Sequence, residues 1–207
     1  VRRAMDIDAS WNAMNMVDFN LYGDPSLGIT TSAPAQTVPT GLQATAGIRR
    51  VGLSWNAYAG ALKYYIKRSV VGGALAIIDS TSLASYADTL SVGDNATYVY
   101  AVSAVTVGGQ SGNSTTVQAT TAPAAVVVKS VVPANRRLSL SWTRSPGATA
   151  FQIFLVRSAD SIGVVGATQD TFYTLTGLVN DSAYKIVVAP LNAQGVRGAY
   201  SAQIVGI

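Results

Sequence analysis

One stretch of alternating apolar and polar residues occurs twice in this chain, and this repeat restricts the fold more than any other feature. Val51-Gly-Leu-Ser-Trp-Asn56 matches Leu138-Ser-Leu-Ser-Trp-Thr143, which places Trp55 and Trp142 87 positions apart (142 minus 55). Two later tyrosines, each six residues after an apolar residue, are 86 positions apart (184 minus 98). Nearly constant spacing of this kind indicates two copies of one structural unit.

Each copy has the size and the pattern of a two-layer β-sandwich. About seven short alternating strands suit a sandwich of this length, and alternation turns one set of side chains inward. Tyr98 follows Val92, and Tyr184 follows Leu178, so each tyrosine ring is expected inside the core with its hydroxyl group bonded to the preceding loop. The predicted structural core residues are Trp55, Tyr98, Trp142 and Tyr184.

The two copies share further landmarks with a known domain family. The residues that carry this pattern are Pro39, Trp55, Tyr64, Ile66, Val92, Tyr98, Val102 and Ala104 in the first copy, and Trp142, Phe151, Ile153, Leu178, Tyr184 and Val188 in the second. Both copies resemble fibronectin type III domains. The resemblance implies two tandem seven-stranded sandwiches over residues 33–121 and 122–207. We therefore expect an all-β fold, preceded by a short N-terminal helix and strand arm over residues 1–32.

The composition argues against several kinds of catalysis. The chain contains no His and no Cys, so Ser-His and Cys-His nucleophile pairs and ordinary zinc sites are excluded. Most aspartates fall where turns and strand ends are expected, which is common because the Asp side chain bonds nearby backbone N–H groups. These aspartates are Asp79, Asp88, Asp94, Asp160, Asp170 and Asp181. We therefore predict that this chain is not an enzyme and has no catalytic, metal-binding or cofactor-binding residues.

Charge and hydropathy restrict the partners. The net charge is +4, and the basic residues are scattered, whereas nucleic-acid binders concentrate them on one face. No apolar run approaches the roughly 20 residues that cross a bilayer, and no secretory signal is visible. We therefore expect no nucleic acid and no membrane span. Because the chain begins with Val, we expect a processed product or a piece of a longer protein.

The first 32 residues belong to neither copy. Residues 2–16 fit a helix with Trp11 on its apolar face, and Val17, Phe19 and Leu21 then alternate as in a strand. One helix and one strand cannot bury their own apolar faces, so we expect residues 1–29 to dock on a protein partner. The predicted docking residues are Trp11, Val17, Phe19, Leu21 and Tyr22.

A short motif in this arm suggests a parent protein. Phe19-Asn-Leu-Tyr-Gly-Asp-Pro-Ser-Leu27 resembles the end of the catalytic domain of gingipain-type cysteine peptidases, which have a caspase-like fold. The resemblance implies an upstream peptidase domain followed by sandwich domains. The catalytic His and Cys of that family have no counterpart in this chain, so no catalytic residue carries over.

Three hypotheses for function follow. The first is a non-catalytic spacer and binding region of a secreted, bacterial, gingipain-like multidomain protein, located outside the cell or at its surface. The second is an extracellular structural or adhesive protein whose arm builds an oligomer or filament by strand addition. The third is binding of a polysaccharide or cell-surface ligand by exposed aromatic residues. The aromatic candidates for the third hypothesis are Trp11, Tyr58, Tyr86 and Tyr200.

Overall fold

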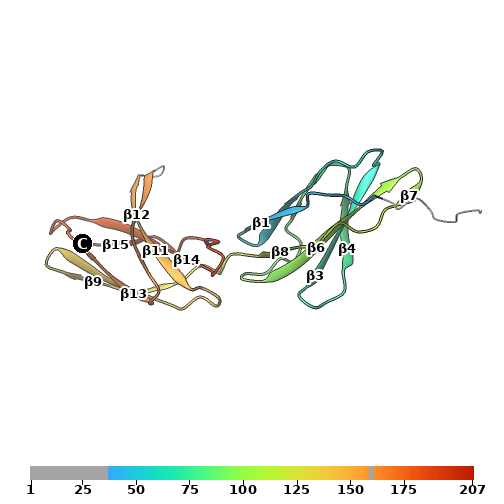
Figure 1. The fold of residues 1–207 in the computed structure, drawn as a ribbon. Coiled ribbons are helices and arrows are strands. Elements are labelled where there is room, and N and C mark those ends of the chain that lie inside the picture. The colour runs from blue at the N-terminus through green and yellow to red at the C-terminus, as the bar shows by residue number, and fades with distance from the viewer. Residues whose placement is uncertain (1–36, 159–160) are drawn as a thin grey trace, which may run out of the picture. The chain divides into compact units, whose positions relative to one another are not determined.

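The computed structural model describes residues 37–158 and 161–207, and the ordered elements in them are β-strands (Figure 1). These strands form two β-sandwiches, named here sandwich 1 (β1–β8) and sandwich 2 (β9–β15). The all-β prediction is confirmed. The expected helix and strand of the N-terminal arm lie outside the described residues, as do the predicted docking residues Trp11, Val17, Phe19, Leu21 and Tyr22.

Sandwich 1 consists of a three-stranded sheet in the order β1-β2-β5 and a five-stranded sheet in the order β4-β3-β6-β7, with β8 also paired to β6. All strand pairs are antiparallel. The strands are β1 (Gln43–Gly47), β2 (Arg50–Ser54), β3 (Lys63–Val70), β4 (Ala76–Thr81), β5 (Ser85–Asp88), β6 (Thr97–Thr106), β7 (Gly109–Gln110) and β8 (Val117–Thr120).

Sandwich 2 repeats this plan with a three-stranded sheet in the order β13-β10-β9 and a four-stranded sheet in the order β12-β11-β14-β15. In Figure 1, β11 lies between β12 and β14, and β12 forms an outer edge. The strands are β9 (Val128–Ala134), β10 (Arg137–Trp142), β11 (Ala150–Ser158), β12 (Ser161–Thr168), β13 (Phe172–Thr176), β14 (Tyr184–Leu191) and β15 (Ile204–Gly206).

The apolar and polar residues that alternate in the sequence are alternately buried and more exposed along the strands. Along β10, Leu138, Leu140 and Trp142 are buried, and the residues between them are more exposed. Each sandwich therefore has its own apolar core between its two sheets, built from the inward residues of facing strands. Because the inner faces of the sheets form the core, a ligand or partner can reach only their outer faces, edges and loops.

Matching loops of the two sandwiches use matching backbone conformations. Arg49 (φ 47°) and Arg136 (φ 54°) lie in the turns of the first hairpins, and both have a left-handed backbone. Asn95 (φ 47°) and Asp181 (φ 60°) each lie three residues before the corner tyrosine. Asn and Asp tolerate this left-handed region better than most other residues, so turn chemistry accounts for the polar residues of these loops.

The segment after β8 is fixed to sandwich 1 by hydrogen bonds. The Oγ1 of the buried Thr121 accepts from the N–H of Ala96 and donates to the carbonyl of Gly93. The N–H of Ala122 donates to the carbonyl of Gly47. These bonds close the base of sandwich 1 immediately before the chain enters sandwich 2.

Candidate interaction surfaces

The two tryptophans predicted for the core lie inside it. Trp55 packs edge-on against Tyr64 with ring centroids 5.2 Å apart, and Trp142 packs against Phe151 at 5.6 Å. Both indole groups are buried, and neither indole N–H finds a hydrogen-bond acceptor in the described part of the chain. Their faces are used in packing, so they offer no platform to a ligand.

The two corner tyrosines bond to the loops that precede them. The hydroxyl oxygen of Tyr98 accepts from the N–H of Gly93 at 3.0 Å, and that of Tyr184 accepts from the N–H of Val179 at 2.7 Å. Both rings pack against their own core, directly or from its rim. These side chains hold the strand that follows each loop, which is a structural role.

A buried ionic cluster lies inside sandwich 1. The carboxylate of Asp88, at the end of β5, has no exposed surface. Its Oδ2 is 2.8 Å from Nη1 of Arg68 and also accepts a 2.8 Å hydrogen bond from the hydroxyl of Tyr100. Its Oδ1 accepts from the N–H of Leu90. Three donors therefore compensate for the removal of this charge from water.

The contacts within this cluster shift the pKa values of Tyr100 and Arg68. Burial and the hydrogen bond to Asp88 raise the pKa of the Tyr100 hydroxyl above its usual range. Burial lowers the pKa of Arg68, but the hydrogen bond to Asp88 and its negative charge outweigh this, so the net shift of that pKa is upward. Both shifts favour the protonated donors that the carboxylate requires.

Asp79, on the edge strand β4 of sandwich 1, has an exposed carboxylate that accepts two hydrogen bonds. Asp79 accepts from the N–H of Ser80 and from the hydroxyl of Tyr86. These two bonds lower the pKa of Asp79. Burial and the hydrogen bond to Asp79 raise the pKa of Tyr86 to about 12.

The sequence analysis expects Asp88 in a turn or at a strand end, and the structure places it at the end of β5 with a second role in the core. The bond to Leu90 is turn chemistry, but the strand register places Asp88 opposite the fully buried Val51, at a core position. The matching register of sandwich 2 places Leu175 opposite Leu138. A position-by-position comparison of the two copies would have revealed an Asp where the other copy has a Leu.

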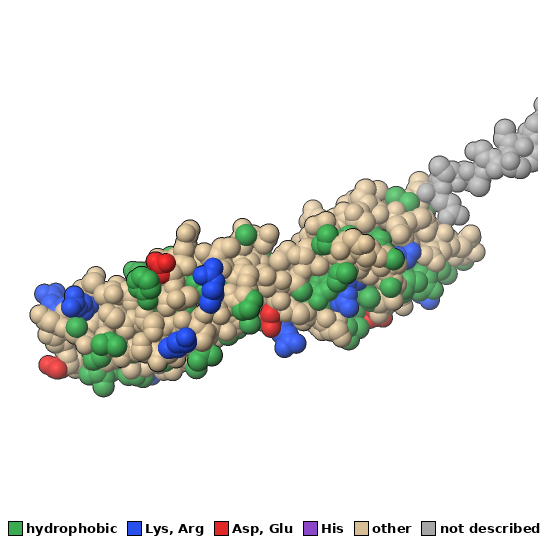
Figure 2. Space-filling model, turned by 90° about the horizontal axis from the view of Figure 1, so that it is seen from below, with side chains coloured by type: hydrophobic (Ala, Val, Ile, Leu, Met, Phe, Trp, Pro, Cys, Tyr) green, Lys and Arg blue, Asp and Glu red, His purple; other side chains and the backbone are tan. Residues whose placement is uncertain are grey.

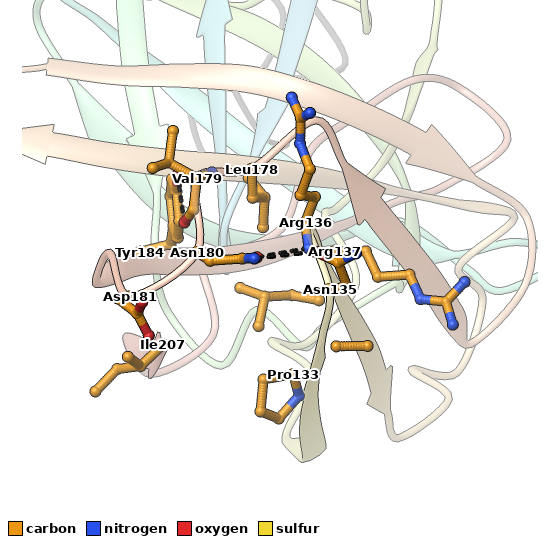
Figure 3. A pocket seen from close by; sticks show the side chains of 12 residues that line it. Pro133, Asn135, Arg136, Arg137, Leu178, Val179, Asn180, Asp181, Tyr184 and Ile207 are labelled. Carbon is orange, nitrogen blue, oxygen red and sulfur yellow. Dashed lines mark hydrogen bonds between the residues drawn. The ribbon is translucent and has the colours of Figure 1, made fainter.

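A hollow of about 350 Å³ lies at the end of sandwich 2, beside the first hairpin turn and the loop before Tyr184 (Figure 3). The side-chain amide of Asn180 spans it, accepting from the N–H of Arg136 and donating to Oδ1 of Asn135. In Figure 3 the guanidinium groups of Arg136 and Arg137 point away from the centre. The amide is engaged within the protein, so this hollow is a weak candidate for a ligand site.

The outer face of the β12-β11-β14-β15 sheet is apolar. Phe154 on β11 lies between Val164 on β12 and Val187 on β14 in the strand register. Phe154 and Val187 form a separate small cluster with Ala189, and Val156 packs against it. Val164 is 55% exposed. Sandwich 2 therefore has apolar contacts on both sides of this sheet.

Neighbouring residues extend this surface. Ile162 lies opposite Val156 in the register and is 41% exposed, and Val205 on β15 is 53% exposed. We name this surface the apolar face of sandwich 2. The residues that define it are Val156, Ile162, Val164, Val187 and Val205, together with Phe154.

The matching face of sandwich 1 is more polar. Lys67 occupies the place of Phe154, between Ile77 on β4 and Ala101 on β6. Its ammonium group donates a 2.6 Å hydrogen bond to Oδ1 of Asn113. The side-chain amide of Gln110 donates a hydrogen bond to Oγ of the buried Ser103. The same fold thus presents a polar face in one sandwich and an apolar one in the other.

Cationic side chains adjoin the apolar face. The guanidinium group of Arg197 stacks on the rings of Phe154 and Tyr200, at 5.4 and 5.2 Å from their centroids. Lys185 lies opposite Val205 and lines a hollow of about 490 Å³ with Arg157. Figure 2 shows that charged side chains are sparse on the side of the molecule it displays.

The aromatic candidates for sugar binding are not gathered into one platform. The hydroxyl of Tyr58 accepts from Thr37, and that of Tyr86 donates to Asp79, while both rings pack against the core of sandwich 1. Tyr200 belongs to sandwich 2 and packs edge-on against Phe154. Trp11 lies outside the described residues.

Metal-ligand clusters and membrane-spanning helices are both absent from residues 37–158 and 161–207. No group of three or more acidic, His or Cys side chains with the spacing of a metal site occurs there. No helix in that part of the chain is long and apolar enough to cross a membrane.

Comparison with known proteins finds structural similarity only. No protein-family model matches the sequence, and no curated protein matches it. The FN1–FN3 domains of chicken CNTN1 are 20% identical, with 84% of this chain and 68% of that chain covered and a TM-score of 0.49. A two-domain fibronectin type III segment from chicken tenascin is 16% identical, covering 82% and 98%, with a TM-score of 0.41. An Fn3-like protein from Clostridium thermocellum is 36% identical over 41% of this chain and 91% of that chain, with a TM-score of 0.37.

The architecture defines the class of the protein. In each sandwich the first, second and fifth strands form one sheet, and the third strand joins the fourth and the later strands in the other. A core tryptophan and a corner tyrosine occupy matching places in both. The fold is a tandem of two fibronectin type III-like β-sandwiches, as the sequence resemblance implies.

Proposed function

We propose that this chain is a non-catalytic spacer and binding region of a secreted multidomain protein, and that sandwich 2 carries the surface for a protein partner. The apolar face of sandwich 2 is the observation that carries this proposal. Phe154 and Val187 are buried at its centre (2% and 5% exposed), and the exposed apolar side chains around them are Ile162, Val164 and Val205. Exposed apolar side chains that gather on one face often mark a site of protein contact. Sandwich 1 has the same strand order but a more polar face, so the fold itself does not require apolar residues there.

The distribution of chemically active side chains supports a role without catalysis. The buried carboxylate of Asp88 is bonded to Arg68 and Tyr100, and that of Asp79 to Tyr86. The corner hydroxyl groups are bonded to backbone. These groups maintain the fold.

We further propose that the parent protein is a gingipain-like cysteine peptidase of a bacterium, with residues 1–29 docked on its catalytic domain. The motif of residues 19–27 supports this parentage. Native mass spectrometry of the protein purified from its source tests it. We expect a second, larger chain that contains Cys and His bound to this one. Copies of this chain alone would contradict the peptidase parent and favour an assembly arm.

A further inference from the structure

We infer that the hollow at the end of sandwich 2 is a docking site for a short extended segment joined to β15, with Thr or Ser directly after Ile207 and a small residue next. The segment would be held as Thr121 and Ala122 are held in sandwich 1. This site goes beyond the proposed function. It involves neither the apolar face of sandwich 2 nor residues 1–29, so its failure would leave that function untouched.

The strand register aligns the ends of the two sandwiches residue by residue. Tyr98 on β6 lies opposite Ala119 on β8. Tyr184 on β14 lies opposite Gly206 on β15. The second residue after Gly206 would therefore correspond to Thr121, which is the second residue after Ala119. The groups that hold Thr121 and its successor in sandwich 1 accordingly have identifiable counterparts in sandwich 2.

Main-chain groups of sandwich 1 hold both residues of its segment. The N–H of Asn95 donates to the carbonyl of Ala122 at 2.8 Å, and the N–H of Ala122 donates to the carbonyl of Gly47 at 3.0 Å. The N–H of Thr121 donates to the carbonyl of Ala96 at 3.0 Å, and the N–H of Ala96 donates to Oγ1 of Thr121 at 2.9 Å. Thr121 and Ala122 have no exposed surface as a result.

The loop before Tyr184 has the same arrangement of main-chain groups. Asp181 corresponds to Asn95, and both have a left-handed backbone. Ser182 corresponds to Ala96, since each lies two residues before its corner tyrosine. In the described part of the chain, no main-chain hydrogen bond is found from the N–H of Asp181 or to the carbonyl of Ser182. These groups are therefore able to bind a further stretch of main chain.

A third counterpart lies across the hollow. Ala134 corresponds to Gly47, because each is the last strand residue before the first hairpin turn of its sandwich. Ala134, Asp181 and Ile207 all line the hollow shown in Figure 3. Gly47 and Asn95 are partly buried, whereas Ala134 and Asp181 are exposed. The same groups are thus covered by a segment in one sandwich and open to solvent in the other.

The chemistry of the site selects a hydroxyl side chain. In sandwich 1, Oγ1 of Thr121 accepts from Ala96 and donates to the carbonyl of Gly93 at 2.7 Å. Val179 corresponds to Gly93, since the N–H of each donates to its corner tyrosine hydroxyl. The carbonyl of Val179 also accepts a 3.4 Å bond from Tyr184, and a carbonyl oxygen can accept two. A side-chain oxygen that both accepts and donates here is that of Thr or Ser.

A main-chain segment fits the hollow better than a small ligand does. The side-chain amide of Asn180, which spans the hollow, is already bonded to Arg136 and Asn135. The groups that remain at the rim are the main-chain groups of Asp181, Ser182 and the strand end before the hairpin. Extended main chain offers alternating donors and acceptors to such groups.

The test extends the full chain at Ile207 by Thr-Ala-Pro-Ala, the sequence of residues 121–124. Two control extensions have the same length. One is Val-Ala-Pro-Ala, which lacks the hydroxyl group, and the other is four glycines. Hydrogen exchange followed by NMR reports on single N–H groups. Exchange at Asp181 should be about tenfold slower with Thr-Ala-Pro-Ala than with four glycines.

The valine extension separates the hydroxyl group from the main chain. The N–H of Ser182 should be protected by the threonine extension and not by the valine one. The N–H of Asp181, whose acceptor would be a carbonyl group, should keep part of its protection in both. Thr121→Val is the matching change in sandwich 1, where exchange at Ala96 should become about tenfold faster.

Equal exchange at Asp181 in the threonine and glycine extensions would overturn the inference. Equal protection of Ser182 by threonine and valine would also overturn it, because the hydroxyl group would then not be recognised. Protection that increases with protein concentration would assign the bound segment to a second copy of the chain, which contradicts a segment joined to its own β15.

Discussion

The hydroxyl group of Tyr100 donates a 2.8 Å hydrogen bond to Oδ2 of Asp88, a carboxylate with no exposed surface. The same oxygen atom is 2.8 Å from the guanidinium group of Arg68. In sandwich 2 the corresponding core places are held by Leu175 and Ile186. One fold therefore stabilises the same region of its core by a charged cluster in one copy and by apolar packing in the other.

Removal of the cation from this cluster should destabilise the protein strongly. Arg68→Met leaves the buried carboxylate of Asp88 without its counter-charge, and such losses typically cost about 3 kcal/mol. Urea unfolding, followed by tryptophan fluorescence, measures the change. Arg144→Met is the control, because Arg144 is exposed and should change the free energy of unfolding by less than about 0.5 kcal/mol.

Asp88 and Tyr100, two members of this cluster, should be energetically coupled. Asp88→Leu combined with Tyr100→Ile copies the residues of sandwich 2, and the double variant should lose less stability than the sum of the two single changes. Urea unfolding of the four proteins of this cycle gives the coupling energy. Simple additivity would show that Asp88 and Tyr100 do not stabilise one another.

The repeat in the sequence was sufficient to predict the two sandwiches, because alternation and the Trp and Tyr landmarks are local signals. Asp88 could not be placed in the same way, since a strand-end Asp is usually a turn residue and its partners Arg68 and Tyr100 are distant in sequence. The apolar face of sandwich 2 was also missed. The sequence analysis gives Phe154 and Val187 no role, and the strand register and their contacts show that they are buried together on the outer side of the sheet.

Alkaline pH should weaken sandwich 1 through Tyr86. The pKa of Tyr86 is about 12 in the fold, above the value of about 10 for an unperturbed tyrosine. The neutral hydroxyl is therefore favoured in the folded state. The resulting stability is fully present below pH about 10 and is lost as pH rises through about 12.

Stability measured by urea unfolding across this range provides the check. Tyr86→Phe has no hydroxyl group to titrate, so its curve should fall less steeply than that of the wild type. Parallel curves for the two proteins would show that the bond between Tyr86 and Asp79 does not couple titration to folding.

The corner hydroxyl groups should contribute similar amounts in both sandwiches. Tyr98→Phe and Tyr184→Phe each remove the acceptor of one backbone N–H, which should lower the free energy of unfolding by about 1 kcal/mol. Tyr65→Phe serves as the control, because the Tyr65 ring lies under Lys63 on the outer face of the sheet, outside the corners. A loss in the control equal to that in the corner variants would contradict the structural role of the corner bonds.

Two glycines of β12 should respond oppositely to the same change. A Cβ atom at Gly166 would lie 2.3 Å from ring atoms of Tyr173, whereas one at Gly163 would meet nothing within 4 Å. Gly166→Ala forces the ring or the strand to move and should cost about 1–3 kcal/mol. Gly163→Ala restricts the unfolded chain without a clash and should be neutral or slightly stabilising.

Thermal unfolding of the two variants is a direct measurement of this difference. The close approach of β12 to Tyr173 joins the two sheets of sandwich 2 at their open edge. Equal melting temperatures for the two variants would show that the ring of Tyr173 moves aside freely, and that the edge of β12 is not held in place by this contact.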